Sequence, residues 1–175
     1  MKGKIFNAQE VKAIIAGNKT QFREVCLFQP TNELAIDALL RLYKPYGIGQ
    51  KIFVKEKFAR SFDNEGNPII TLEADSKQER KWKPAQHMKQ EHSRLTLEIT
   101  NIKMERLQDI SEEDARLEGF PVDHLGNYYE PSKLDPWQGY ATASFSLSWN
   151  PTHKKPEEKF YANPFVWVVN FKVNK

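Results

Sequence analysis

The sequence contains a single cysteine, Cys26, among its 175 residues, so an internal disulfide is excluded. No apolar run approaches the roughly 20 residues that a membrane-spanning helix needs. The segment 1–6 also lacks the apolar stretch of a secretory signal. These absences predict a soluble protein of the reducing cytoplasm, with no membrane partner.

Other absences exclude whole classes of site. The sequence contains neither the glycine-rich loop that cradles phosphates nor the dinucleotide-binding fingerprint. No cysteine cluster or regular ligand spacing surrounds the four histidines, which argues against a zinc site. They are His87, His92, His124 and His153. We therefore expect no metal and no cofactor.

The chain also lacks a large excess of one charge sign. The chain has 26 basic and 23 acidic residues, a net charge of +3 that neither requires nor excludes a nucleic-acid partner. Several basic residues fall in one stretch beside Trp82: Lys77, Arg80, Lys81, Lys83, Lys89 and Arg94. We interpret this stretch as a solvated surface loop, with a nucleic-acid contact as the alternative.

Local signals predict two helices near the N-terminus. Asn7 and Glu10 have the spacing of a capping box, and Gly17 is placed to end that helix in a left-handed conformation. Residues 18–23 then leave the helix end as a turn or short strand, a type of position that often carries function. A second helix should begin near Asn32 and bury four apolar side chains. These are Leu34, Ala38, Leu39 and Leu42.

Strands are predicted in the middle and at the end of the chain. Residues 51–58 and 68–72 are rich in strand-forming side chains and flank a hairpin-like turn at 63–67. Residues 94–102 alternate between apolar and polar, as a half-buried strand does. Residues 165–173 begin with an apolar run, which is typical of a central strand.

A short helix and a long insertion separate the last two strands. Ser111 and Asp114 form a variant capping box, and Gly119 should stop the helix. Residues 120–158 are rich in turn formers and are interpreted as a loop insertion, about 120–160. The order of elements predicts one α+β domain over 1–175, with a small mixed β-barrel, a few flanking helices and this insertion.

Two residues resist a purely structural explanation. Lys19 closely follows the end of the first helix, where a cation also suits the helix dipole. Glu118 lies in the last turn of the short helix, where a carboxylate meets the negative end of the dipole. A paired cation would relieve that cost, and a Lys–Glu pair in a pocket can tune a general acid or base.

The motif order resembles the ASCH domain family, which has a PUA-like fold. Residues 15–23 are similar to its Gly-x-Lys-Thr signature, and 47–57 to its next strand. Residues 110–119 and 165–171 resemble its later helix and closing strand. The resemblance is nearest to a subgroup encoded by phages and prophages, mostly without assigned function. It covers most of the chain, and 120–158 least.

The resemblance implies a site but departs from it at one position. Family members that deacetylate acetylcytidine use a threonine nucleophile, a lysine and a glutamate. By motif, the lysine falls on Lys19 and the glutamate on Glu118, while Phe22 stands where the nucleophile would be. Thr20 adjoins Lys19, but neighbouring residues of an extended segment point to opposite faces. A covalent mechanism is therefore in doubt, although the pair could still activate water.

The leading hypothesis is a phage or prophage module that binds a nucleoside, nucleotide or RNA. The expected ligand-binding residues are Lys19, Thr20, Arg23, Trp82, Arg94 and Glu118. Lys19 and Arg23 would meet phosphate or carbonyl oxygens, Glu118 a donor on the base edge, and Trp82 the base face. Two alternatives stay open. One is an amidohydrolase that uses Lys19 and Glu118, and the other is a protein partner, such as a host factor, bound through residues 120–160.

Overall fold

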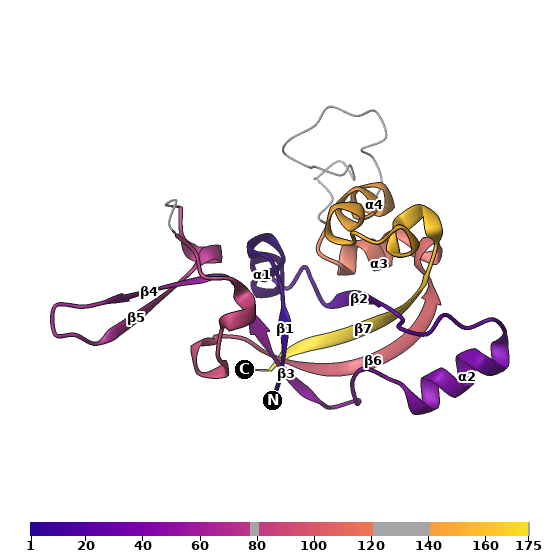
Figure 1. Ribbon diagram of the computed structural model, residues 1–175, viewed down its shortest axis with the longest axis horizontal. Helices are drawn as coiled ribbons and strands as arrows, with labels where there is room; N and C mark the ends of the chain where they lie inside the picture. Colours follow the sequence, from indigo (N-terminus) through magenta and orange to yellow (C-terminus); the bar gives the residue numbers. More distant parts are fainter. Residues whose placement is uncertain (78–80, 121–140, 175) are drawn as a thin grey trace.

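A computed structural model describes residues 1–77, 81–120 and 141–174. Its strands are β1 (Lys2–Ile5), β2 (Gln21–Val25), β3 (Lys51–Lys55), β4 (Phe58–Phe62), β5 (Pro68–Leu72), β6 (Thr96–Arg106) and β7 (Phe165–Asn174). Its α-helices are α1 (Ala8–Ile15), α2 (Glu33–Leu42), α3 (Glu112–Leu117) and α4 (Ala141–Thr152). This content confirms the predicted α+β class (Figure 1).

Five strands form one mixed sheet in the order β1-β3-β6-β7-β2. The β1–β3 pair is parallel, and the other three pairs are antiparallel. The long β6–β7 ladder carries a register shift between Ile99 and Asn101, and both strands curve (Figure 1). A bulge of this kind bends a strand and increases its twist.

The curvature brings the two edge strands of the sheet towards each other. Lys4 of β1 lies 2.6 Å from the carboxylate of Glu24 on β2, and the Tyr46 hydroxyl donates to the same carboxylate at 2.9 Å. The Phe6 ring, just after β1, packs edge-on against Phe22 of β2. In the described residues, the sheet curls like a barrel, but β1 and β2 share no backbone ladder. Side-chain contacts between these two edge strands close the curl.

Alternate residues of β7 serve two separate cores. Trp167, Val169 and Phe171 point into the core inside the curl. Val166 and Val168 point the other way, into a core shared with α3 and α4. Both faces of β7 are therefore buried, which confirms the prediction of a central strand.

The predicted caps of two helices are confirmed. Asn7 and Glu10 form the capping box of α1, and Gly17 follows its end with φ +80°. The Ser111 side chain accepts a hydrogen bond from the Asp114 amide at the start of α3. Local capping chemistry therefore fixes where the two segments that carry Lys19 and Glu118 begin and end.

The burial predicted for α2 is wrong for three of its four residues. The helix begins near Asn32 as expected, but Leu34, Ala38 and Leu42 are exposed and Leu39 is only half-buried. The helix carries two apolar stripes, and periodicity does not determine which one faces the sheet. No described helix is long and apolar enough to cross a membrane.

The predicted loop at 120–158 contains a helix, α4. Ala141, Phe145 and Trp149 lie four residues apart on its buried face. Its first turn is capped from α3, because the Glu112 carboxylate accepts hydrogen bonds from the Ala141 and Thr142 amides at 2.7 and 3.2 Å. A tertiary contact thus stabilises this helix where local sequence does not. Residues 121–140 lie outside the described part of the chain.

Candidate functional site

A cleft of about 840 Å³ separates α1 from α4. Its α1 side includes Glu10 and Lys12, and its α4 side includes Phe145 and Trp149. The end of β1, the start of β2 and the end of α3 supply the remaining wall, with Lys19, Phe22, Arg23 and Glu118 among the lining residues. The volume falls within the range of small-molecule sites.

The backbone holds Lys19 and Glu118 side by side. The two residues form an isolated antiparallel bridge, and the Thr20 amide donates to the Leu117 carbonyl at 2.9 Å. Gly119 follows with φ +94°, and a Cβ there would lie 3.1 Å from the Cβ of Lys19. A glycine is needed at this point because both the dihedral and the close approach disfavour a side chain.

The Glu118 carboxylate lies between two cations. Its Oε2 accepts a hydrogen bond from Lys19 Nζ at 2.9 Å, and its Oε1 accepts one from Arg23 Nη1 at 2.8 Å. All three side chains are at most 5% exposed. This pairing offsets the unfavourable position of a carboxylate at the end of α3.

The Lys19 ammonium is almost fully occupied by the protein. One proton goes to the Glu118 carboxylate and another to the Glu118 carbonyl oxygen at 2.8 Å. The remaining direction points towards Glu10 Oε1 at 3.5 Å, a longer and weaker contact. A ligand oxygen would compete most easily for this third position.

A second layer of charged groups surrounds Arg23 behind the cleft. Arg23 Nη2 lies 2.6 Å from Glu105 and 3.3 Å from Asp114, and Nη1 donates to Gln21 at 2.6 Å. Lys103 contacts Glu105 and Asp114 from the surface side, at 2.9 and 3.1 Å. Both terminal nitrogens of the guanidinium are thus held, and the side chain is 0% exposed. Arg23 thus belongs to the wall of the cleft, where its buried guanidinium positions Glu118.

The ionised form of Asp114 is favoured by its partners. Burial by itself would raise the pKa of this carboxyl, but hydrogen bonds from Gln21 and Lys103 and the charges of Lys103 and Arg23 outweigh it. The net effect holds the pKa of Asp114 below its usual value.

Aromatic rings form the α4 side of the cleft. The His153 imidazole stacks on the Trp149 indole with centroids 3.8 Å apart and planes at 9°. Trp149 is anchored by its indole N–H, which donates to the Glu158 carbonyl at 2.8 Å. Phe145 packs against the same indole and lies under the Arg23 guanidinium at 5.6 Å. Because His153 covers one face of Trp149, a planar ligand on that side would meet imidazole rather than indole.

Three of the six predicted ligand residues lie together, and three do not. Lys19, Arg23 and Glu118 line the cleft. Thr20, Trp82 and Arg94 are absent from its lining. Arg94 instead forms ion pairs with the buried Glu56 at 3.1 Å and with Asp75 at 2.6 Å. These pairs connect the segment before β6 to the residue after β3 and to the turn after β5.

Phe22, the residue at which the sequence departs from the family resemblance, is part of the core. Its side chain is 3% exposed and its ring contacts those of Phe6, Tyr46 and Phe171. The hydroxyls among the described lining residues belong to Ser148 and Thr152, and both donate to carbonyls of α4. Neither is bonded to the Lys–Glu pair.

Sequence reasoning missed several contributors to the site. Glu10 was interpreted only as a helix cap, yet it also faces Lys19. Glu105, Gln21 and the α4 aromatic Phe145 had no local motif to single them out. Their roles depend on contacts between residues about 80 to 120 positions apart along the chain, for which a single sequence carries no signal.

Comparisons with known proteins found little similarity in sequence. No protein-family model and no curated protein matches the chain. It is similar to a solved structure from Enterococcus faecalis, of family DUF984, at 11% identity, with 99% of this chain and 76% of that one covered and a TM-score of 0.46. It is also similar to a solved ASCH domain from Lactobacillus crispatus at 16% identity, with 98% and 78% covered and a TM-score of 0.39. ASCH is the family that the motif order resembles, but likenesses of this size assign no activity.

Proposed function

We propose that the cleft binds a nucleobase, as part of a nucleotide or RNA. The observation that carries this proposal is the buried Lys19–Glu118–Arg23 cluster at the wall of a large open cleft. The Lys19 ammonium, one direction of which is held only by a weak contact to Glu10, lies beside the Glu118 carboxylate, so the cluster offers a donor next to an acceptor for a base edge that presents a carbonyl and an amino group. Pyrimidines of the cytosine type present both groups.

Each residue of the cluster has a separate task in this proposal. Lys19 donates to a carbonyl oxygen of the base and gives up its weak contact to Glu10. Glu118 accepts from the exocyclic amino group, while Arg23 holds its carboxylate in place from behind. The rings of Phe145 and His153 lie on the α4 side, where a base can stack.

Calorimetric titration with cytidine, acetylcytidine, uridine and a short single-stranded RNA tests the proposal. Glu118→Gln keeps the shape of the side chain but weakens acceptance from an amino group. Because a hydrogen bond to a charged group contributes about 1.5–3 kcal/mol, we expect a loss of about 10-fold to 150-fold in affinity. Glu113→Gln is the matched control, since Glu113 is exposed on the same helix.

Two results would contradict the binding proposal. One is the absence of heat with every ligand for the wild-type protein. The other is an equal loss of affinity in Glu113→Gln and Glu118→Gln, which would assign the effect to the general charge of α3 instead of the cleft.

An amidohydrolase that acts on an acylated cytidine is a second candidate function. It is favoured by the Lys19–Glu118 contact itself, because a carboxylate beside an ammonium can shuttle a proton to and from water. Incubation of the protein with acetylcytidine, followed by chromatography, separates the two functions. Turnover that disappears in Glu118→Gln supports catalysis, whereas binding without product supports a recognition module.

A further inference from the structure

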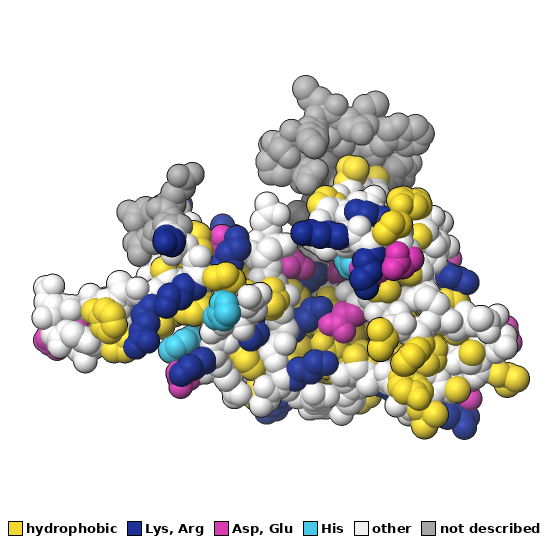
Figure 2. All heavy atoms as spheres, viewed as in Figure 1, with side chains coloured by type: hydrophobic (Ala, Val, Ile, Leu, Met, Phe, Trp, Pro, Cys, Tyr) yellow, Lys and Arg dark blue, Asp and Glu magenta, His cyan; other side chains and the backbone are white. Residues whose placement is uncertain are grey.

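Helix α2 presents an apolar stripe to solvent. Leu34, Ala38 and Leu42 follow one another at intervals of four residues, which places them on one line along the helix. Leu34 is 83% and Leu42 74% exposed. Figure 2 shows hydrophobic side chains gathered over this end of the molecule. We call these three residues the α2 stripe.

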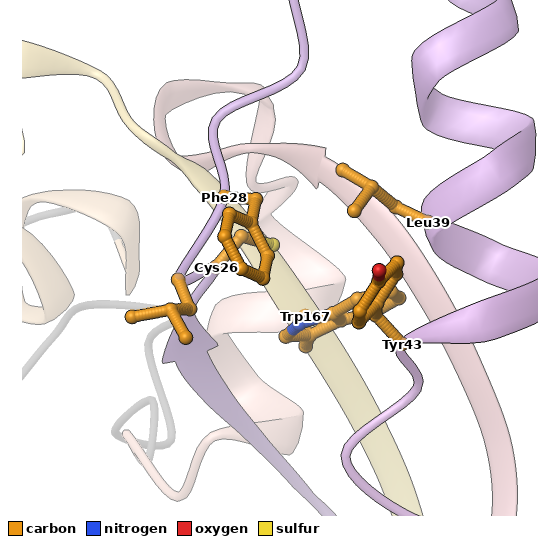
Figure 3. Close-up of a pocket in the computed structure, with 6 residues that line it drawn as sticks. Cys26, Phe28, Leu39, Tyr43 and Trp167 are labelled. Atoms are coloured by element: carbon orange, nitrogen blue, oxygen red, sulfur yellow. The ribbon is translucent and has the colours of Figure 1, made fainter.

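An apolar hollow lies on a neighbouring face of α2. The hollow has a volume of about 100 Å³ and lies between α2 and the segment after β2 (Figure 3). It is lined by Cys26, Leu27, Phe28, Leu39, Tyr43 and Trp167. Leu27 is 86% exposed, and the Phe28 and Tyr43 rings pack edge to face with centroids 5.4 Å apart. Exposed apolar side chains gathered on one element and beside it are typical of a protein-binding face.

We propose that the α2 stripe is the contact of a symmetric dimer, with α2 of one copy antiparallel to α2 of a second copy. The stripe is the same in both chain directions, because two leucines flank a central alanine at equal spacing. A twofold axis at Ala38 places Leu34 against Leu42 of the second copy, and the reverse. A self-complementary surface is what a twofold interface requires.

The residues around the stripe fit the same arrangement. Ala38 is small, so the two helix backbones can approach closely at the axis. Asp37 and Arg41 form an exposed pair at 3.0 Å beside the stripe. The twofold axis brings Arg41 of one copy within one helical turn of Asp37 of the other. The apolar contact thus gains a polar, charge-matched rim.

The area of the interface indicates how much of the surface a second copy would cover. A stable interface buries about 800 Å² on each partner, which is more than one short helix stripe provides. Leu27, Phe28 and Tyr43, which line the hollow, are also exposed apolar side chains. The second copy would therefore cover both the α2 stripe and the mouth of the hollow.

Sedimentation over a range of protein concentrations tests the dimer. We expect the wild-type chain to dimerise and the double variant Leu34→Glu with Leu42→Glu to raise the dissociation constant at least about 100-fold. Ile69→Glu, an exposed apolar residue on β5, should leave the dimer intact. A wild-type chain that stays monomeric at every concentration overturns the proposal, and so does a dimer that persists in the double variant.

Oxidative cross-linking tests the position of the axis. A disulfide needs Cα atoms about 4.4–6.8 Å apart, a distance that only residues close to the twofold axis can meet. Ala38→Cys should therefore give a covalent dimer, whereas Leu34→Cys should not, because residue 34 faces residue 42. Cys26 is buried and does not compete for the oxidant. Efficient linkage through residue 34, or none through residue 38, overturns the antiparallel arrangement.

Discussion

At the scale of single residues, the site depends on the compensation of buried charge. Glu118 lies where the α3 dipole opposes it, yet two cations contact its two oxygens. Taking three charged side chains out of water is costly unless each has partners. The cleft therefore has its charged groups already in place before any ligand arrives.

Asp114 is the acidic residue that we expect to couple stability to pH. Its folded pKa is depressed, so its contribution is fully present above the ordinary carboxyl range and is lost as the pH falls through the folded pKa. Asp114→Asn should lower the free energy of unfolding at pH 7 by about 1–3 kcal/mol. It should also flatten the loss of stability below pH 4. Urea unfolding at several pH values measures both effects, and parallel curves for the two proteins would rule out this role.

Cys26 should react very slowly in the folded protein. Burial raises the pKa of its thiol to about 12, so almost no thiolate is present at pH 8. Titration with a thiol reagent should therefore show slow modification that becomes rapid in denaturant. Fast reaction of the folded chain would mean that the apolar hollow opens around this residue.

At the scale of elements, the junction between α3 and β2 decides the geometry of the site. Gly119→Ala should destabilise the fold and weaken ligand binding, because the new Cβ would press on the Lys19 side chain. Gly17→Ala is the matched control, since Gly17 also has a positive φ but no atom within 4 Å of an added Cβ. The control should cost only the backbone penalty of about 1–2 kcal/mol. Thermal unfolding of both variants measures the difference in stability. An equal loss of stability in the two variants would contradict the role of close packing at Gly119.

Sequence patterns predicted some helices and missed one, depending on whether the signals that form each helix are local. The caps of α1 and α3 depend on neighbouring residues only, so Asn7 and Ser111 correctly predicted where these helices begin. Helix α4 was missed because its serines and threonines favour no helix strongly, and Phe145, Leu147 and Trp149 alternate like a strand. Its cap comes from Glu112, almost thirty residues earlier, which no local pattern indicates.

At the scale of the whole molecule, the β4–β5 hairpin projects from the body, away from α3 and α4 (Figure 1). It forms a separate two-stranded sheet. Replacement of residues 60–70 by a two-residue turn should therefore leave the remaining fold and any cleft binding unchanged. Circular dichroism and the calorimetric titration check this. A loss of RNA binding with retained nucleoside binding would instead place part of an RNA contact on the hairpin.

The sequence by itself determined the α+β class, the caps of the first and third helices and the central position of the last strand, because each follows from short-range periodicity or capping chemistry. It also singled out Lys19 and Glu118, since one follows a helix end and the other opposes a helix dipole. Only the tertiary structure decided that the two side chains meet, that Arg23 supports them from behind, and that Trp82 and Arg94 lie elsewhere. Those outcomes depend on tertiary pairing, above all the bridge between the segment before β2 and the end of α3, which brings together side chains that are far apart along the chain.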